Sequence, residues 1–230
     1  MPQKKSKICA SCSLQRIWLL LLFSACGEAI PEMQPPPDGP TMSGACTRAD
    51  FDDGTPHPMS IESGSFTYPK VGCLDGAGCA RNNPTGGGHY LTHAYSQPQE
   101  GTFGLRVRIY PEAGWPAAFA GPKLVMRCDN GNDLRVELWS PTQAYFQQNS
   151  ARITMDHKSP EEGWTDVLLL LDKANHTLTY YENGAVVHSQ TLSAGCRVGI
   201  SSILIGVGVV DGYQAGFRFD SVKAGPPSCY

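Results

Sequence analysis

Through much of residues 46–230, apolar side chains alternate with polar ones at a period of two. The segments LRVRIY at 105–110 and LRVELW at 134–139 show this alternation most clearly. A period of two places successive side chains on opposite faces of a β-strand, and glycine and proline recur too often here for long helices. The sequence therefore predicts an all-β domain, an antiparallel β-sandwich with one buried and one exposed side to each strand.

A hairpin is predicted at 178–187, where Asn183-Gly184 separates two runs rich in β-forming residues. Asn-Gly readily adopts the positive φ values that a two-residue type I′ turn requires. The run Val167 to Leu171 is apolar on both faces, which is typical of a central strand. Further strands are expected at 61–68, 89–96, 123–128, 151–155, 198–209 and 216–222.

The N-terminus has the layout of a secretion signal. Residues 1–25 contain four basic residues, no acidic residue, and a short apolar run at 17–23. This run is too short for a membrane-spanning helix, which needs about 20 apolar residues. We therefore expect 1–25 to be a signal peptide, with an uncleaved anchor or cleavage elsewhere as the alternatives.

The segment Phe23-Ser24-Ala25-Cys26-Gly27 resembles the bacterial lipobox, with Phe23 in place of the usual leucine. The resemblance implies cleavage before Cys26 and attachment of diacylglycerol and a further acyl chain such as palmitate to that cysteine. Several acyl chains together would anchor the protein stably in a lipid bilayer. Because Gly27 replaces the aspartate that favours retention at the inner membrane in such lipoproteins, the resemblance implies an outer-membrane location, facing either side.

Residues 26–45 are rich in proline and form the predicted tether between the lipid and a single domain at 46–230. All four basic residues of the signal are lost with it, which leaves 14 basic and 21 acidic residues and a net charge of −7. A mildly acidic chain without a basic block argues against nucleic acid as a partner. The sequence leaves the oligomeric state open.

Six cysteines lie in 46–230, an even number that indicates disulfides in an exported protein. Zinc is the competing interpretation, but no pair has the CxxC spacing of a thiolate site. Six cysteines allow 15 connectivities. The expected pairs are Cys73–Cys79 across a glycine-rich loop, Cys46–Cys229 joining the domain ends, and Cys128–Cys196 by elimination.

Three short patterns resemble concanavalin A-like and laminin-G-like jelly rolls. They are the opening segment 49–54, the segment 163–184 with a W-x-x-V strand before the Asn-Gly turn, and the closing segment 216–222. The resemblance implies a jelly-roll sandwich, with Trp164 in the core and a role connected with glycans. Because this architecture hosts lectins, hydrolases, lyases and adhesion modules, the fold does not select among them.

The sequence contains little evidence of a catalytic site. Hydrolases of the jelly-roll class carry their paired carboxylates on one strand in an E-x-D-x-x-E pattern, which this chain lacks. Polysaccharide lyases of this class use arginine, histidine and tyrosine on the concave face, so a lyase remains an alternative.

The candidate glycan-binding residues are the polar members of the alternating strands, together with one tryptophan on a proline-rich loop. If both strand faces coincide, they line a polar groove with aromatic rings on which sugars can stack; otherwise they form ordinary solvated faces, or Trp139 lies under a loop. The same period groups His89, His93 and Tyr95. The set is Arg106, Arg108, Tyr110, Arg135, Glu137, Trp139 and Trp115.

A structural calcium ion is the one cofactor that the sequence suggests. In many sugar-binding jelly rolls, acidic residues of the first and last strands meet at one cation, and Asp52, Asp53 and Asp220 are of the matching type. Solvated surface carboxylates are the competing interpretation.

We therefore expect an exported lipoprotein that binds envelope or extracellular polysaccharide. A structural or adhesion module without a sugar site and a polysaccharide lyase are the alternatives.

Overall fold

A computed structural model describes residues 44–74, 78–84, 87–112, 121–148, 151–157, 163–192, 199–208 and 216–230. Strands account for most of the described part, which contains a 3-10 helix at Pro227–Cys229 and no α-helix. No helix in these ranges is long and apolar enough to cross a membrane. The strands are β1 (Thr47–Ala49), β2 (Ser60–Ser63), β3 (Phe66–Thr67), β4 (Ala80–Asn82), β5 (His89–Gln99), β6 (Phe103–Pro111), β7 (Pro122–Cys128), β8 (Asp133–Leu138), β9 (Gln143–Gln148), β10 (Ala151–Asp156), β11 (Thr165–Asp172), β12 (Thr177–Glu182), β13 (Ala185–Thr191), β14 (Ile200–Val207) and β15 (Phe217–Gly225).

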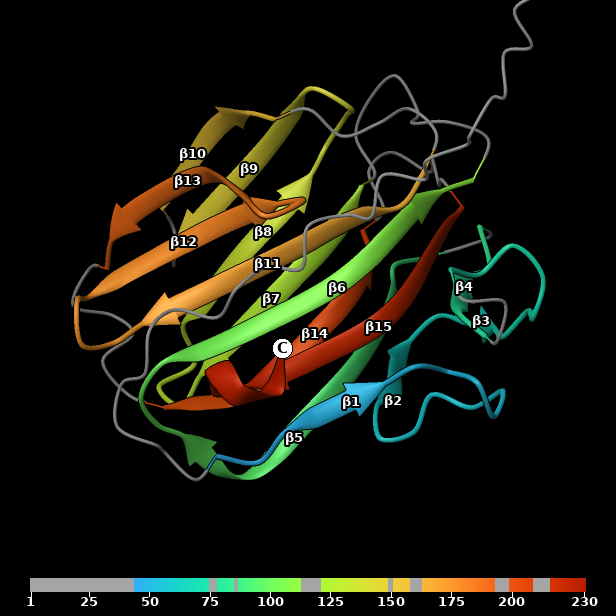
Figure 1. The fold of residues 1–230 in the computed structure, drawn as a ribbon, viewed down its shortest axis with the longest axis horizontal. Helices are drawn as coiled ribbons and strands as arrows, with labels where there is room; N and C mark the ends of the chain where they lie inside the picture. The colour runs from blue at the N-terminus through green and yellow to red at the C-terminus, as the bar shows by residue number, and fades with distance from the viewer. Residues whose placement is uncertain are drawn as a thin grey trace, which may run out of the picture. The chain divides into compact units, whose positions relative to one another are not determined.

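The strands form two antiparallel sheets, one in front of the other in Figure 1. The sheet that we call the β6 sheet has the order β13-β12-β11-β6-β15-β4-β3, with β1 also paired to β15. The β8 sheet has the order β10-β9-β8-β7-β14-β5-β2. The predicted antiparallel β-sandwich is confirmed.

The core between the sheets is built by the apolar members of the alternating segments. Leu105 and Val107 of β6, and Leu134 and Val136 of β8, are completely buried in one hydrophobic cluster. Their polar neighbours in sequence consequently point outward, as period-two alternation predicts. Inward apolar burial of this kind contributes about 25 cal/mol per Å² to stability.

The predicted hairpin between β12 and β13 is confirmed. Asn183 and Gly184 have φ values of 46° and 81°, the positive values that a type I′ turn requires. Asn183 also accepts a hydrogen bond from the backbone N–H of Asp166 through its side-chain oxygen. The turn thereby ties the hairpin to β11, the next strand of the sheet.

Two predicted disulfides are present: Cys46–Cys229 and Cys73–Cys79. Cys128 is also disulfide-bonded, and its predicted partner, Cys196, lies outside the described residues. Cys46 directly precedes β1 and Cys229 follows β15, so their bond closes the two ends of the domain against each other.

Several local predictions were wrong. The opening strand is Thr47–Ala49, whereas 51–54 is a turn closed by a hydrogen bond from the N–H of Gly54 to the carbonyl of Phe51. The segment 61–68 contains two strands instead of one, because Gly64, with a φ of 71°, ends β2. The strands β4 and β9 were not predicted, since β4 is three residues long and β9 carries glutamine in both inward and outward positions.

The proposed face of His89, His93 and Tyr95 is also corrected. Tyr95 packs against the hydrophobic core, where it accepts a hydrogen bond from the hydroxyl of Thr47 at 3.0 Å. His89 is 2% exposed, and Leu91, which shares its face of β5, is completely buried in the core. These odd-numbered side chains of β5 therefore face inward.

Candidate functional site

The structure divides the predicted glycan-binding residues between two sheets. Arg106, Arg108 and Tyr110 lie on β6, and Arg135 and Glu137 lie on β8, with Trp139 directly after it. Because the apolar neighbours of both groups fill the core between the sheets, the two polar groups face away from each other. The predicted single groove is therefore wrong. Trp115 lies outside the described residues.

An aromatic cluster lies on the outer face of the β8 sheet, which is the rear sheet in Figure 1. Trp139 and Tyr145 meet edge to face, with 4.2 Å between ring centroids. The guanidinium carbon of Arg152 lies 3.4 Å from the centroid of Tyr145 and 5.0 Å from that of Trp139. Arg152 is exposed and both rings are half-buried, so rings and a cation are available at the surface. We call these three residues the Trp139 cluster.

Glu137 links the Trp139 cluster to the neighbouring strand. The indole N–H of Trp139 donates a hydrogen bond to Glu137, and the ammonium of Lys123 lies 3.1 Å from the same carboxylate. Lys123 stands directly opposite Glu137 in the pairing of β7 with β8. Glu137 is only 8% exposed, so its contact with Lys123 is shielded from solvent and holds the indole in one orientation.

A hollow of about 180 Å³ lies on the same outer face, and its lining includes Lys123, the ion-pair partner of Glu137. Cross-strand ion pairs border it: Arg127 contacts Glu62 at 3.2 Å and Asp133 at 3.9 Å. Tyr90 contributes a phenol whose pKa is raised, chiefly by burial. The hollow thus offers charged groups, a hydroxyl and apolar surface together. Its lining comprises Glu62, Tyr90, Lys123, Val125, Arg127, Asp133, Arg135 and Leu204.

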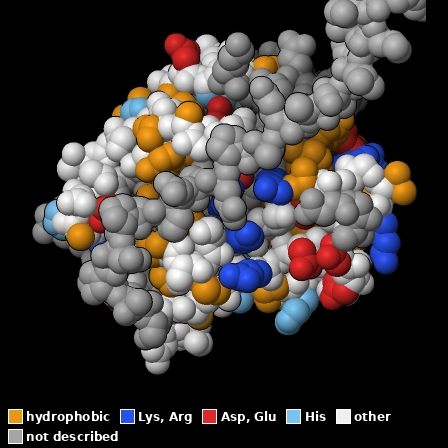
Figure 2. All heavy atoms as spheres, viewed as in Figure 1, with side chains coloured by type: hydrophobic (Ala, Val, Ile, Leu, Met, Phe, Trp, Pro, Cys, Tyr) orange, Lys and Arg blue, Asp and Glu red, His pale blue; other side chains and the backbone are white. Residues whose placement is uncertain are grey.

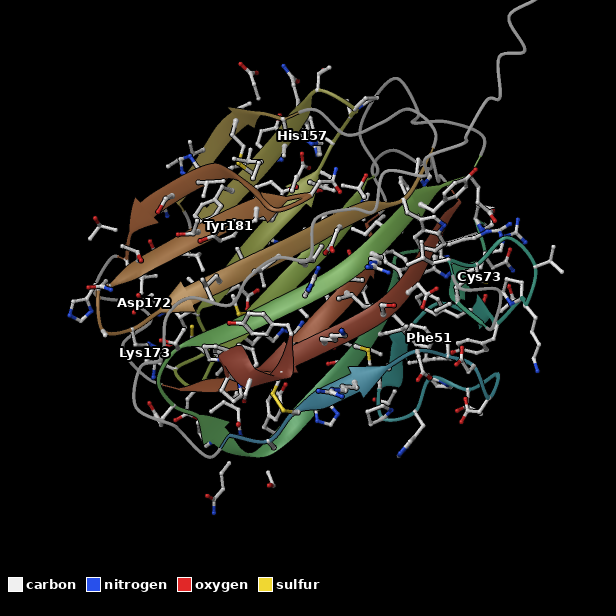
Figure 3. All side chains as sticks on the ribbon, in the orientation of Figure 1. Phe51, Cys73, His157, Asp172, Lys173 and Tyr181 are labelled. Atoms are coloured by element: carbon white, nitrogen blue, oxygen red, sulfur yellow. A yellow bond between two sulfur atoms is a disulfide. The ribbon has the colours of Figure 1, made fainter. Side chains whose placement is uncertain are left out.

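A buried histidine supports the loop that carries Trp139, and sequence analysis did not identify it (Figure 3). His157 Nε2 lies 2.7 Å from the carbonyl oxygen of Ser140, and Nδ1 lies 2.7 Å from the carboxylate of Glu182. The hydroxyl of Tyr180 donates to the same carboxylate. Glu182 belongs to β12 of the β6 sheet, whereas Ser140 and His157 adjoin β8 and β10, so the network joins the two sheets.

Burial by itself would lower the pKa of His157, because a charged ring loses its hydration. The hydrogen bond and negative charge of Glu182, together with the Ser140 carbonyl, outweigh burial and raise that pKa above 6.5. Since a carbonyl oxygen only accepts, Nε2 carries a proton, and the protonated ring can donate from Nδ1 to Glu182 as well. The loop is therefore held by a buried ion pair in the charged state of His157.

On the opposite outer face, Arg106 and Arg108 share the carboxylate of Asp166. Arg106 Nε donates to it at 2.9 Å, and Arg108 Nε lies 3.8 Å away. Tyr110 packs against Trp164, with ring centroids 5.5 Å apart. Trp164 is half-buried beside this outward tyrosine and outside the core cluster, which corrects its expected place in the core.

The three aspartates proposed for calcium do not come together. Asp53 accepts hydrogen bonds from the N–H and hydroxyl of Thr55, which lower its pKa. Asp220 is 4% exposed and accepts from the backbone N–H groups of Leu74 and Ser221. Among the described residues, no group of three or more histidine, cysteine, aspartate or glutamate side chains could hold a metal ion. The structure does not support a calcium site built from Asp52, Asp53 and Asp220.

No protein-family model matches this sequence, and no curated protein sequence matches it. Among solved structures, the apo form of the Crh5 transglycosylase is similar with a TM-score of 0.57 at 13% identity, covering 86% of this chain and 90% of that one. A conserved carbohydrate esterase from the Shiga toxin-encoding bacteriophage phi24B is similar with a TM-score of 0.57 at 10% identity, covering 78% and 95%.

A protein named sialidase is similar with a TM-score of 0.56 at 14% identity, covering 79% of this chain but 18% of that one. The names of all three neighbours describe proteins connected with carbohydrates. At identities this low, the similarity shows a shared β-sandwich fold and does not transfer an activity.

Proposed function

We propose that the chain is an exported, lipid-anchored protein whose jelly-roll sandwich binds polysaccharide on the outer face of the β8 sheet. The Trp139 cluster, on the same outer face as the hollow, is the observation that carries this proposal. It combines partly exposed aromatic rings with charged and hydrogen-bonding groups, which is the chemistry that sugar rings and their hydroxyls require.

The contacts that hold the Trp139 cluster in place are consistent with a binding role. Glu137 fixes the indole N–H, Arg152 lies across the tyrosine ring, and His157 holds the loop from behind. A surface that is already ordered loses little conformational entropy when it binds a ligand. The three structural neighbours, whose names are connected with carbohydrates, support the same class of ligand.

Replacement of Trp139 tests the proposal. Trp139→Ala should weaken retention of the protein in gels that contain its polysaccharide ligand by about tenfold, since buried aromatic anchors contribute about 1–2 kcal/mol or more to an interface. Trp139→Phe keeps a ring and should lose less. Affinity electrophoresis across a polysaccharide panel, with thermal unfolding to verify the fold, measures both variants. Equal retention of wild type and Trp139→Ala would rule out binding centred on this cluster.

The same panel separates the alternatives. A structural or adhesion module without a sugar site would migrate unchanged in every gel. A polysaccharide lyase would release unsaturated uronate products, which absorb ultraviolet light, from an acidic polymer. The proposed binding protein is retained by a polymer and leaves it intact.

Lipid attachment at Cys26 is proposed from the signal-like segment 1–25 and its lipobox. The disulfides support export, because such bonds form and persist in oxidising compartments. Cells fed labelled palmitate should incorporate the label into wild type and not into Cys26→Ser, which should also leave the membrane fraction. Label retained by Cys26→Ser would contradict this assignment.

A further inference from the structure

Three cations stand in one row across the outer face of the β6 sheet. Lys223 of β15 lies directly opposite Arg106 of β6 on one side and Arg48 of β1 on the other. Neighbouring strands are about 4.8 Å apart, so the three side chains leave the sheet at adjacent positions. Figure 2 shows Lys and Arg side chains gathered near the middle of this face. We call Arg48, Arg106 and Lys223 the cation row.

The cation row places like charges opposite each other on neighbouring strands, which is unusual in a sheet. Like charges directly opposite each other destabilise an antiparallel pair, whereas opposite charges stabilise it. Asp166 compensates Arg106, with which it forms three hydrogen-bond contacts. In the described part of the chain, neither Arg48 nor Lys223 forms an ion pair. Within the described residues, the repulsion between them is therefore offset only in part, by the charge of Asp166 on Lys223.

Two carboxylates on the strands of this sheet are already engaged. Asp166 is 3% exposed and serves Arg106 and Arg108 together. Asp220, on the same strand as Lys223, accepts hydrogen bonds from the backbone N–H groups of Leu74 and Ser221. Burial and the charges of Arg106, Arg48 and Arg108 lower the pKa of Lys223 in spite of Asp166, which agrees with a local excess of positive charge.

The domain ends hold this arrangement in place. The Cys46–Cys229 disulfide lies directly before β1, so it keeps this three-residue strand, and with it Arg48, against β15. The ring of Tyr230 lies on Gly104 of β6, where any Cβ would collide with it. A row of like charges on an ordered surface reduces stability, and features that reduce stability are often retained at functional sites.

We infer that the cation row binds the carboxylate or sulfate groups of an acidic polysaccharide. Cations in line across three strands match a ligand whose anionic groups repeat along a chain. Membrane docking would bring large exposed apolar side chains beside the cations. In the described part those are Ile61, Val71, Ile153 and Val186, and none of them lies on β1, β6 or β15.

This surface lies on the opposite sheet from the Trp139 cluster, so the inference does not depend on the proposed function. The protein produced from the full-length sequence is tested for binding to polygalacturonate, which supplies carboxylates, to dextran sulfate, which supplies sulfates, and to neutral dextran. Binding to at least one anionic polymer, weaker in high salt and absent with dextran, is expected.

The test variant is the double substitution Arg48→Gln and Lys223→Gln, which leaves the Arg106–Asp166 pair intact. It should weaken binding to the anionic polymer by about fivefold or more. Its melting temperature should equal or exceed that of wild type, because the repulsion is relieved. Lys173→Gln is the control for loss of a cation outside the row. Lys173 lies at the β11–β12 turn (Figure 3), where it contacts Glu100, and the variant should bind as wild type does.

A neutral polysaccharide distinguishes the two surfaces: if the Trp139 cluster binds one, it should retain the double variant as it retains wild type. Three outcomes would overturn the inference: no binding to either anionic polymer, equal binding by the double variant and Lys173→Gln, or binding to vesicles of phosphatidylglycerol without binding to the polymers. A double variant with a lower melting temperature would also count against it, because the cations would then be stabilising the sheet.

Discussion

Glu182 occupies an inward position of β12, where an acid is costly unless it has partners. Tyr180 and His157 supply them, and Glu182 is 5% exposed. The inward phase of Glu182 was visible in the alternation of Leu178, Tyr180 and Glu182. No partner for Glu182 was inferred from this phase, because His157 lies 25 residues away along the chain and has no pattern of its own.

Glu182→Gln should destabilise the domain by about 3 kcal/mol, because it removes one member of a buried pair and leaves His157 without its counter-charge. Glu62→Gln is the control, since Glu62 pairs with Arg127 at the exposed surface and should cost at most about 1 kcal/mol. Urea unfolding of both variants measures the difference. Equal losses would show that the buried network contributes no more than a surface pair does.

At the scale of elements, the turn residues fix the register of the β12–β13 hairpin. Asn183 and Gly184 both have positive φ values, which the type I′ turn requires and most side chains disfavour. The ladder runs from Glu182↔Ala185 at the turn to Thr177↔Thr191 at the far end, with one bulge at Tyr180/Tyr181. This local geometry was predictable because it depends on neighbouring residues alone.

Gly184→Ala should therefore cost about 1 kcal/mol, entirely through backbone conformation, since a Cβ at this position meets no atom within 4 Å. Gly87→Ala provides a close comparison: its Cβ would also be in open space, but its φ is not in the positive range. Gly87→Ala should be neutral or slightly stabilising. Thermal unfolding of both variants measures the two changes in stability. Equal changes would refute the explanation from backbone conformation.

At the scale of the molecule, the stability of the domain depends on pH through two sets of contacts, and the two act in opposite directions. One is the pair of His157 with Glu182, and the other joins Glu112 to Arg218 and Arg81. The pKa of His157 is raised above 6.5, so the stability from its pair is fully present below pH 6.5 and is lost as pH rises through the folded-state value. Burial raises the pKa of Glu112, but hydrogen bonds from Arg218 and Arg81 outweigh it and lower that pKa below 4.5. The stability from Glu112 is present above pH 4.5 and is lost as pH falls through its folded-state value.

The melting temperature should consequently be highest between about pH 4.5 and 6.5 and should decline on both sides. His157→Gln should flatten the alkaline decline and leave the acidic one, while Glu112→Gln should do the reverse. Melting curves that extend from below pH 4.5 to above pH 6.5 check both statements. An alkaline decline that persists unchanged in His157→Gln would assign it to another group.

The sequence by itself determined the features that depend on short stretches of chain. The alternating segments at 105–110 and 134–139, the Asn183-Gly184 turn, and the pairing of Cys73 with Cys79 follow from the geometry of strands, turns and short loops. These features established the β-sandwich and which side chains point outward.

The tertiary structure alone decided which outward side chains share a surface. β6 and β8 have the same alternation, yet they belong to different sheets, so Arg106 and Trp139 lie on opposite faces. The cation row and the His157–Glu182 pair join residues far apart in the sequence. The physical reason is that alternation is set within one strand, whereas the neighbour of a strand is set by long-range pairing that no local pattern encodes.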